Sequence, residues 1–348
     1  MLSIDEFPGR TINIDGKNYL YFGGTSYLGL QTSSEFQSVF IANIKKYGTA
    51  YSASRKSNIQ ISVFNEIESY LSNIVGSEAC ITMSSGYLAG QLVCDYFSDE
   101  NYKLYYAPNT HSAVLRRNQK VYENWQQLQG DILLNRDKIP VLFLDSIDFY
   151  GLNFPNFKLL QELRLTNIIL VVDDSHGIGI TGINGGGSFQ FLQSLNPKEL
   201  IISCSLGKGF GIQAGAIFST NSFISNLKET QFYGGASPAM PAALASIKQG
   251  HHIIQEKRKL LARNTSLFLN NLPNSALFQS SNGHPTFSFK NELLASHLQD
   301  NTILVTNFRY PTENDVLMSR IVLSAAHTEN DILHLCNTIN TIPFNSIQ

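Results

Sequence analysis

The chain has 348 residues, of which 43% are hydrophobic and 15% are charged, and its net charge at pH 7 is −2. This length and this hydrophobic fraction are sufficient for one large and one smaller domain with a sizeable core. The nearly neutral chain offers no basic surface for nucleic acid or for an anionic membrane, so neither is expected as a partner.

Sorting signals and metal-binding patterns are not evident in the sequence. No apolar run reaches the roughly 18 residues that a membrane-spanning helix requires. Residues 1–6 form neither the basic nor the apolar part of a signal peptide, and we expect a cytoplasmic protein. The four cysteines lack paired metal-ligand spacing and predict buried free thiols in a reducing compartment. They are Cys80, Cys94, Cys204 and Cys336.

The N-terminal elements follow from simple periodicities. Residues 11–22 alternate around Asp15-Gly16 and predict a β-hairpin. Helical periodicity predicts helices over residues 34–47 and 59–75. The apolar stripe expected in the second helix consists of Ile59, Val63, Ile67, Tyr70, Leu71 and Ile74.

Residues 79–90 combine a strand, a turn of small residues and the start of a helix. Residues 79–83 predict the strand, and Ser85, Gly86 and Tyr87 follow where the helix begins. The first-turn N–H groups of a helix are unpaired and its dipole is positive there, so this turn is a candidate anion site. An ordinary N-cap is the alternative interpretation.

Three further predicted strands run into polar residues. They cover residues 103–106 before His111, residues 141–146, and residues 168–172 before Asp173, Asp174 and His176. Apolar runs of this kind are typical of parallel strands that are buried on both faces. Ligands bind at the carboxyl ends of such strands, where these polar residues are expected to lie.

Lys208 lies in a predicted loop of small residues after the apolar strand that begins at residue 201. Its neighbours Gly207 and Gly209 have little bulk, so a flat ligand could approach it closely. A lysine removed from water has a lowered pKa and can act as a nucleophile. A solvated loop lysine is the alternative interpretation.

Asp173 and Lys208 together predict a pyridoxal phosphate (PLP) site. Such a site needs an acidic partner for the pyridinium nitrogen and a lysine for the Schiff base. The two residues are 208 − 173 = 35 positions apart, which leaves room for one crossover between their strands. A metal site at Asp173, Asp174 and His176 is the alternative, but it leaves Lys208 and His111 unexplained, so no metal is expected.

The predicted fold class is α/β, with a mostly parallel central sheet flanked by helices and a smaller α+β C-terminal domain. A long helix is expected over residues 242–261. The predicted domains are an N-terminal segment (1–40), a large cofactor-binding domain (41–250) and a small C-terminal domain (251–348).

Two motifs carry a resemblance to a known family. Asp173-Asp174-Ser175-His176-Gly177 resembles the Asp-Glu-Ala-His motif of the α-oxoamine synthases, and Ser205-Leu206-Gly207-Lys208 resembles their Thr-x-x-Lys motif. These are fold-type-I, PLP-dependent enzymes. Further similarities extend from Tyr27 to Thr328 and cover most of the chain.

The resemblance implies a role for each candidate residue. Lys208 would form the Schiff base and act as general base, while Asp173 would face the ring nitrogen and His176 the phenolic oxygen. His111 would stack on the ring. The phosphate would be bound by Ser85, Gly86, Tyr87 and Ser205. Arg320 would bind the substrate carboxylate, and Thr25 would also contact the substrate. The implied protein is a homodimer with shared active sites. It would condense a small amino acid with an acyl-CoA or other acyl thioester to give an α-amino ketone.

Three departures from the family pattern leave the reaction open. Thr25 replaces an asparagine, residues 147–151 lack a serine that the family has after Ser146, and Gly234-Gly235 replaces a hydroxyl pair. One alternative is an aminotransferase, or other α-carbon chemistry on the same cofactor. Another is a non-catalytic descendant that binds a partner or ligand.

Two other residues have open interpretations at this stage. Arg55 follows a loop rich in small residues and is either adjacent to the site or an ordinary surface residue. His327 is expected to be a packing or helix-start residue.

Overall fold

A computed structural model describes residues 3–135, 137–148, 153–272, 277–309, 313 and 317–342. The chain divides into two compact units. Unit 1 consists of residues 1–37, 149–151 and 252–348, and unit 2 consists of residues 38–148 and 152–251. The N-terminal residues therefore share a unit with the C-terminal part of the chain.

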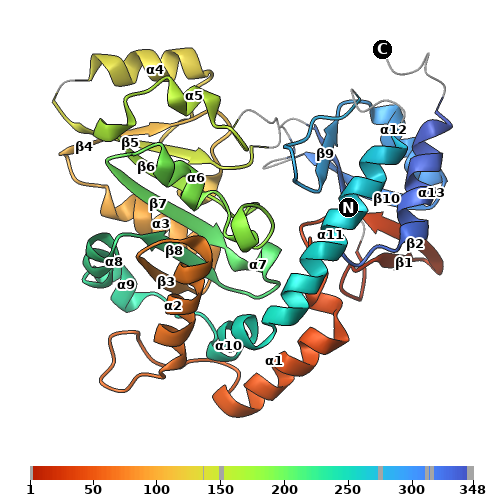
Figure 1. Ribbon diagram of the computed structural model, residues 1–348, viewed down its shortest axis with the longest axis horizontal. Helices are drawn as coiled ribbons and strands as arrows, with labels where there is room; N and C mark the ends of the chain where they lie inside the picture. Colours follow the sequence, from red (N-terminus) through yellow and green to blue (C-terminus); the bar gives the residue numbers. More distant parts are fainter. Residues whose placement is uncertain are drawn as a thin grey trace. The chain divides into compact units, whose positions relative to one another are not determined.

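Unit 2 is built on a six-stranded sheet with the order β3-β8-β7-β6-β5-β4 (Figure 1). The strands are β3 (Ala79–Met83), β4 (Tyr102–Tyr106), β5 (Ile139–Asp145), β6 (Ile169–Asp173), β7 (Glu199–Ser205) and β8 (Gly215–Ser219). Strands β4 to β7 pair in parallel, and β8 runs antiparallel to both β7 and β3. The carboxyl ends of β3 to β7 therefore lie at one edge of the sheet.

Helices surround this sheet and confirm the predicted α/β class (Figure 1). The α-helices of unit 2 are α2 (Val63–Val75), α3 (Gly86–Tyr96), α4 (Trp125–Leu134), α5 (Lys158–Gln161), α6 (Phe189–Ser194), α7 (Leu206–Gly209), α8 (Asn221–Lys228), α9 (Gln231–Gly235) and α10 (Pro241–Gln249). Short 3-10 turns are η2 (Ser112–Val114), η3 (Leu165–Asn167) and η4 (Ile183–Gly185). Helix α1 (Ser34–Tyr47) begins in unit 1 and continues into unit 2.

The sheet of unit 2 is buried on both faces. One face packs on α3 and α8 in a single apolar cluster that includes Val141, Phe143, Ile169, Val171, Ile201 and Ile217. The alternating residues, which point to the other face, are equally buried and include Leu142, Leu144, Leu170, Val172, Ile202 and Phe218. This explains why the strands are almost continuously apolar until their carboxyl ends.

Unit 1 has a five-stranded sheet with the order β1-β2-β10-β11-β9. Its strands are β1 (Thr11–Ile14), β2 (Lys17–Phe22), β9 (Thr286–Phe289), β10 (Ile303–Arg309) and β11 (Leu317–Val322). Its helices are η1 (Leu30–Thr32), most of α11 (His251–Asn271), α12 (Glu292–Asp300) and α13 (Glu329–Asn340). Because β2 pairs with β10, the N-terminal hairpin extends the C-terminal sheet.

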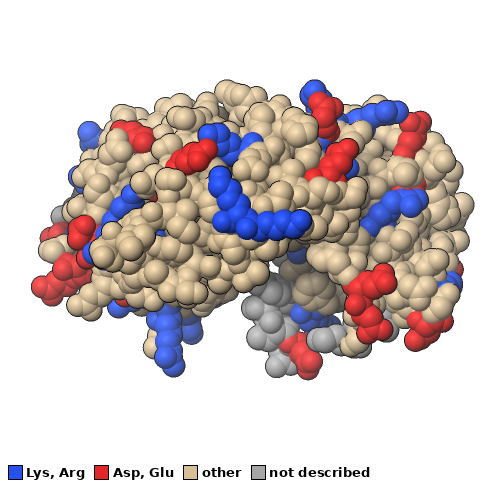
Figure 2. Space-filling model, turned by 90° about the horizontal axis from the view of Figure 1, so that it is seen from below, with Lys and Arg blue, Asp and Glu red and all other residues tan. Residues whose placement is uncertain are grey.

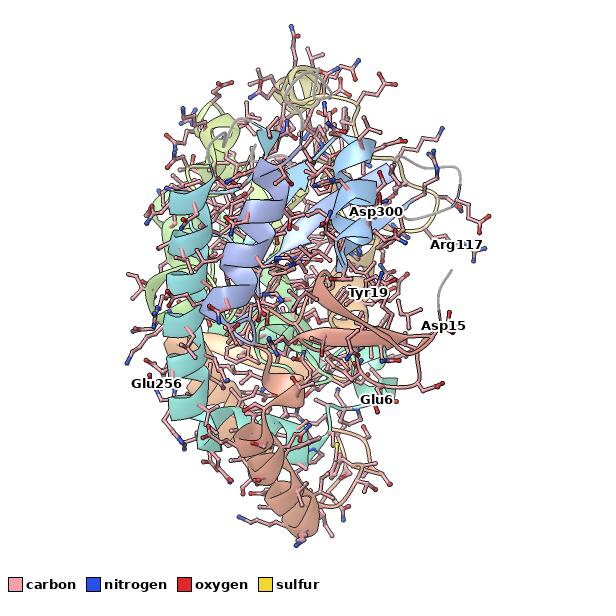
Figure 3. All side chains as sticks on the ribbon, turned by 90° about the vertical axis from the view of Figure 1, so that its right-hand side faces the viewer. Glu6, Asp15, Tyr19, Arg117, Glu256 and Asp300 are labelled. Atoms are coloured by element: carbon pink, nitrogen blue, oxygen red, sulfur yellow. The ribbon has the colours of Figure 1, made fainter. Side chains whose placement is uncertain are left out.

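The predicted hairpin is confirmed. Strands β1 and β2 pair antiparallel with Ile14 opposite Lys17. The two turn residues have positive φ angles, 50° at Asp15 and 81° at Gly16, as a two-residue type I′ turn requires. Figure 3 labels Asp15 at this turn.

Two predicted helix boundaries are wrong. Helix α2 begins at Val63, and Ile59 precedes it with 77% of its surface exposed. The Ile59 carbonyl accepts hydrogen bonds from the side chains of Tyr51 and Ser57, which hold the residue in a turn. The expected single helix over residues 242–261 is divided into α10 and α11 at Gly250, a residue with low helix propensity.

The charged side chains on the surface and the state of the cysteines agree with the amino-acid composition. On the face shown in Figure 2, Lys and Arg side chains lie among Asp and Glu side chains on a mainly uncharged surface. All four cysteines are buried and free. Within the described ranges, no helix has both the length and the apolarity needed to cross a membrane.

Arg55 is a buried residue, so its interpretation as a surface residue is wrong. Its guanidinium donates to both carboxylate oxygens of Glu68, at 2.7 and 3.1 Å, and lies 4.0 Å from the centroid of the Phe64 ring. Glu68 also accepts hydrogen bonds from the backbone N and the hydroxyl of Thr82, both at 2.9 Å. The pair fastens the segment before α2 to β3.

We predict that Arg55→Ala lowers the free energy of unfolding by about 3–5 kcal/mol, because it leaves the Glu68 carboxylate buried without its cation. Lys56→Ala is the matched control: Lys56 pairs with Glu229 at the surface at 3.2 Å, and its loss should cost less than about 1 kcal/mol. Urea denaturation of both variants measures the difference. Equal losses would contradict the assignment.

His327 is a packing residue, as expected. It is 5% exposed, and its ring centroid lies 4.0 Å from that of Phe22. Nδ1 accepts from the Ser324 backbone at 3.0 Å, and Nε2 donates to the Tyr21 carbonyl at 2.9 Å. This arrangement requires the neutral ring. Burial lowers the pKa of His327 to about 4.

We predict that acidification destabilises unit 1 through His327. The folded-state pKa lies below the unfolded value, so the native state binds fewer protons between pH 6.5 and 4, and stability falls as the pH falls. A pKa lowered from 6.5 to about 4 reduces the free energy of unfolding by roughly 3 kcal/mol once the pH is below both values. Urea denaturation at pH 7 and pH 4.5 should show a smaller pH effect in His327→Gln than in the wild type. The exposed His252 provides the control His252→Gln; a wild-type pH effect in His327→Gln argues against the mechanism.

Candidate active site at the carboxyl edge of the unit 2 sheet

Lys208 lies on α7, a single helical turn that follows β7 directly. The prediction that Lys208 lies in a loop is therefore wrong, because the residue lies in a helical turn. Ser205 caps this turn, since its Oγ accepts from the Gly207 backbone at 3.2 Å. The cap and the turn place the lysine just beyond the carboxyl end of a buried strand.

The amine of Lys208 contacts an imidazole from the neighbouring strand. The distance between Lys208 Nζ and His176 Nε2 is 2.9 Å, and both side chains are partly buried. The two residues follow β7 and β6, which pair in parallel. The structure thus brings together the two predicted catalytic residues that can exchange a proton.

Asp173 is held at the end of β6 by the loop that follows it. Its Oδ1 accepts from the Ser175 backbone at 2.9 Å, and its Oδ2 lies 3.9 Å from Nδ1 of His111. The Ser175 hydroxyl in turn accepts from the Ser205 backbone at 2.8 Å. One serine therefore links the carboxylate to the strand that leads to Lys208.

His111 follows β4, and its side chain is 35% exposed. Nδ1 accepts a hydrogen bond from the Ala113 backbone at 3.2 Å, which requires a lone pair on that nitrogen. Burial lowers the pKa of His111, the Asp173 charge raises it, and the Lys208 charge lowers it further. The ring is therefore neutral and presents a flat face rather than a second positive charge.

Asp145, at the end of β5, is a site residue that sequence reasoning missed. Its Oδ1 accepts from the His111 backbone at 2.9 Å. The carboxyl is opposite Asp173 in the register of β5 and β6. Burial and the Asp173 charge raise the pKa of Asp145 well above its usual value. The signal was available, since Asp145 ends an apolar strand as Asp173 does.

Asp174 has a different task from Asp173. It is 1% exposed and accepts hydrogen bonds from the Ser146 hydroxyl and from the Ser188 backbone. Burial raises its pKa to about 6, although these hydrogen bonds favour the ionised form. Asp174 thus anchors the glycine-rich loop before α6. Among the described residues, no cluster of three or more His, Cys, Asp or Glu could hold a metal.

The predicted anion site lies at the N-terminus of α3. Ser85 is the N-cap, and its Oγ accepts from the Leu88 backbone at 3.1 Å while its hydrogen can still be donated. A Cβ added to Gly86 would lie 2.7 Å from backbone atoms of Ser205, so only glycine lets this helix start approach β7 so closely. Tyr87 is 57% exposed and contributes a first-turn N–H group.

Gly209 has a packing role that sequence reasoning did not assign. A Cβ at this position would lie 2.1 Å from the Ile178 carbonyl oxygen. The small size of Gly209 therefore allows the Lys208 turn to pack on the loop that carries His176. This contact helps to set the distance between the two side chains.

Arg320 and Thr25 belong to unit 1. Arg320 lies on β11 opposite Thr306 and Ser288. Burial raises the pKa of the Tyr27 hydroxyl to about 12, and the nearby Arg320 charge acts to lower it. Thr25 lies in the segment after β2. Of residues 147–151, which lack the family serine, Phe149, Tyr150 and Gly151 lie outside the described residues.

The arrangement in unit 2 has a clear chemical capacity. A primary amine beside an imidazole can act as a nucleophile and can transfer a proton. A carboxylate and a neutral aromatic ring flank it, and a helix N-terminus provides for an anion. The amine, the carboxylate, the aromatic ring and the helix N-terminus could together bind a flat, phosphorylated aldehyde.

Comparisons with known proteins agree with this capacity. The family model described as "Aminotransferase class I and II" matches residues 155–339. An 8-amino-7-oxononanoate synthase from Buchnera aphidicola is 26% identical over 358 residues, covering 97% of this chain and 92% of the relative.

Solved structures show the same fold. The serine palmitoyltransferase of Sphingomonas wittichii has a TM-score of 0.80 at 15% identity, covering 98% of this chain and 91% of that one. A serine palmitoyltransferase from S. paucimobilis, solved with a bound PLP–myriocin aldimine, has a TM-score of 0.81 at 16% identity, covering 97% and 90%. These similarities confirm the predicted fold of a type-I PLP-dependent transferase.

Proposed function

This chain belongs to the aminotransferase class I and II family, and from that membership we propose that it is a PLP-dependent C-acyltransferase of the α-oxoamine synthase type. It condenses a small amino acid with an acyl-CoA or another acyl thioester and produces an α-amino ketone. The relatives named 8-amino-7-oxononanoate synthase and serine palmitoyltransferase support this reaction class.

One observation carries the proposal. Lys208 Nζ lies 2.9 Å from His176 Nε2, and the adjacent strand end carries Asp173. The capped start of α3 packs against the residue that precedes the lysine turn, with Gly86 beside Ser205. An amine, a carboxylate and an anion site in this relation fit the aldehyde, the ring nitrogen and the phosphate of PLP.

The cofactor would be held by residues of unit 2. The proposed phosphate contacts are the Ser85 and Ser205 hydroxyls and the first-turn N–H groups of Gly86 and Tyr87. Asp173 would hold the proton of the pyridine nitrogen, and His111 would stack on the ring. Bound PLP supplies an electron sink for the α-carbon of an attached amino acid.

The chain's own residues handle the proton and the substrate. Lys208 Nζ would hold the cofactor and later take the proton from the substrate α-carbon. His176 orients that amine through the hydrogen bond at Nε2 and would contact the phenolic oxygen of the cofactor. Arg320 would bind the amino-acid carboxylate through its planar guanidinium, and Thr25 would face the substrate.

We predict that the purified protein with PLP shows the visible absorption band of the covalently held cofactor, and that it consumes an acyl-CoA with glycine, alanine or serine. Lys208→Ala should lose the borohydride-reducible adduct and reduce thioester consumption by roughly 10²–10⁴-fold, because the proton-transfer group is gone. Lys198→Ala, at an exposed lysine before β7, is the control and should behave as the wild type.

The same assay separates the alternatives. Conversion of keto acids without thioester consumption would indicate an aminotransferase and contradict acyl transfer. A wild-type protein with neither the band nor any turnover would indicate a non-catalytic descendant. In either outcome the proposed reaction is wrong.

We also propose a homodimer with shared active sites. Large apolar side chains of unit 2 are exposed, with exposed fractions of 77% for Ile59, 68% for Ile183 and 57% for Tyr87. A stable homodimer would typically cover such residues in an interface of roughly 2,000 Å² or more. Sedimentation should give twice the 38.7 kDa chain mass, and Ile59→Asp should shift it toward the monomer. A wild-type monomer at micromolar concentration would contradict the dimer.

A cytoplasmic location is proposed because four buried free thiols suit a reducing compartment. Cell fractionation tests it, and recovery of the protein from a membrane or secreted fraction would overturn it.

A further inference from the structure

Two carboxyl groups from neighbouring strands meet at one histidine. Asp145 and Asp173 end β5 and β6 and are direct partners in the parallel register, so their side chains project from the same face of the sheet. Asp145 Oδ1 accepts from the His111 backbone at 2.9 Å, and Asp173 Oδ2 lies 3.9 Å from His111 Nδ1. The site therefore contains a carboxyl pair rather than one acid.

Each of the two carboxyls accepts one backbone N–H at 2.9 Å, Asp173 from Ser175 and Asp145 from His111. Asp145 faces the Asp173 and Asp148 charges, while the His111 backbone N–H and the Lys208 charge act in the opposite direction. Burial is the largest effect on the Asp145 carboxyl and raises its pKa.

We propose that Asp145 is a positioning residue whose carboxyl oxygen fixes His111 through the backbone N–H, while Asp173 faces the cofactor. The inference deepens the proposed function and rests on it, because His111 and Asp173 have these tasks only if PLP binds here.

The hydrogen bonds around His111 show why one acceptor matters. Its backbone is held by Asp145 and its Nδ1 by the Ala113 N–H. Gln91 on α3 donates to the carbonyls of Ser112 and Ala113, at 3.3 and 3.0 Å. The segment before His111 is also joined to β5, because the Ala107 N–H and the Thr110 hydroxyl donate to the Phe143 carbonyl at 2.9 and 3.2 Å. The Asp145 contact acts on the His111 main chain itself, so its loss should let the ring turn away from its stacking position.

The two acids should therefore respond differently to the same isosteric change. An amide oxygen accepts a backbone N–H as a carboxyl oxygen does, so asparagine should replace Asp145. At position 173 the amide cannot supply the negative charge that keeps the pyridine nitrogen protonated. This asymmetry distinguishes a positioning acceptor from a second charged partner.

The test measures the PLP dissociation constant by equilibrium dialysis, and the circular dichroism of bound PLP, at pH 7. Asp145→Ala should weaken PLP binding roughly tenfold, as expected for one lost hydrogen bond in a buried site, and should change the dichroism. Asp145→Asn should restore both, while Asp173→Asn should weaken binding by at least the same factor. Asp95→Asn, at an exposed carboxyl of α3, is the control for charge removal and should match the wild type.

Two results would overturn the inference while leaving the proposed function intact. Wild-type PLP binding and dichroism in Asp145→Ala would mean that Asp145 does not position His111. A loss in Asp145→Asn equal to that in Asp173→Asn would mean that Asp145 works as a charged group. If Asp145→Ala fails to fold by thermal melting, the comparison between the two asparagine variants decides the question. Wild-type protein that binds no PLP would refute the proposed function as well.

Discussion

The site depends on the two hydrogen bonds of Ser175. Its backbone N–H holds one oxygen of Asp173, and its hydroxyl accepts from the backbone of Ser205. These contacts fix the carboxylate at the end of β6 relative to the strand end from which Lys208 emerges. Without them, two adjacent parallel strands would set only the spacing of their main chains. The positions of the carboxylate and the amine, on which the proposed cofactor chemistry depends, would not be determined.

The consecutive acids Asp173 and Asp174 illustrate how one strand end serves both chemistry and structure. In an extended chain, successive side chains point in opposite directions. One acid therefore faces His111, and the other accepts hydrogen bonds from Ser146 and Ser188. Asp174 in this way fixes the loop that follows His176. The dipeptide thus supplies a carboxylate for the candidate site and an anchor for the loop around it.

The sequence predicted what depends on local pattern and missed what depends on tertiary contacts. Apolar runs that end in polar residues identified Asp173, His111 and the start of α3, because ligands collect at strand ends. The helical turn at Lys208 was missed, since glycines suggested a loop and the Ser205 cap became visible only in the structure. Ile59 matched the helical stripe, but side-chain hydrogen bonds to its carbonyl hold it outside α2. Asp145 was overlooked although it ends an apolar strand as Asp173 does, and its contact with the His111 backbone became visible only in the structure.

Two glycines allow the start of α3 to contact the lysine turn although another strand lies between their strands. The candidate anion site follows β3, whereas Lys208 follows β7, and β8 runs between them. Gly215, the first residue of β8, is opposite both Met83 and Ser205. A Cβ there would lie 2.2 Å from the Ser85 carbonyl oxygen, and a Cβ on Gly86 would meet Ser205. Because both positions lack side chains, the start of α3 reaches across the intervening strand to the lysine turn. Any larger residue at either position would separate the start of α3 from the lysine turn, so the proposed binding site depends on both glycines.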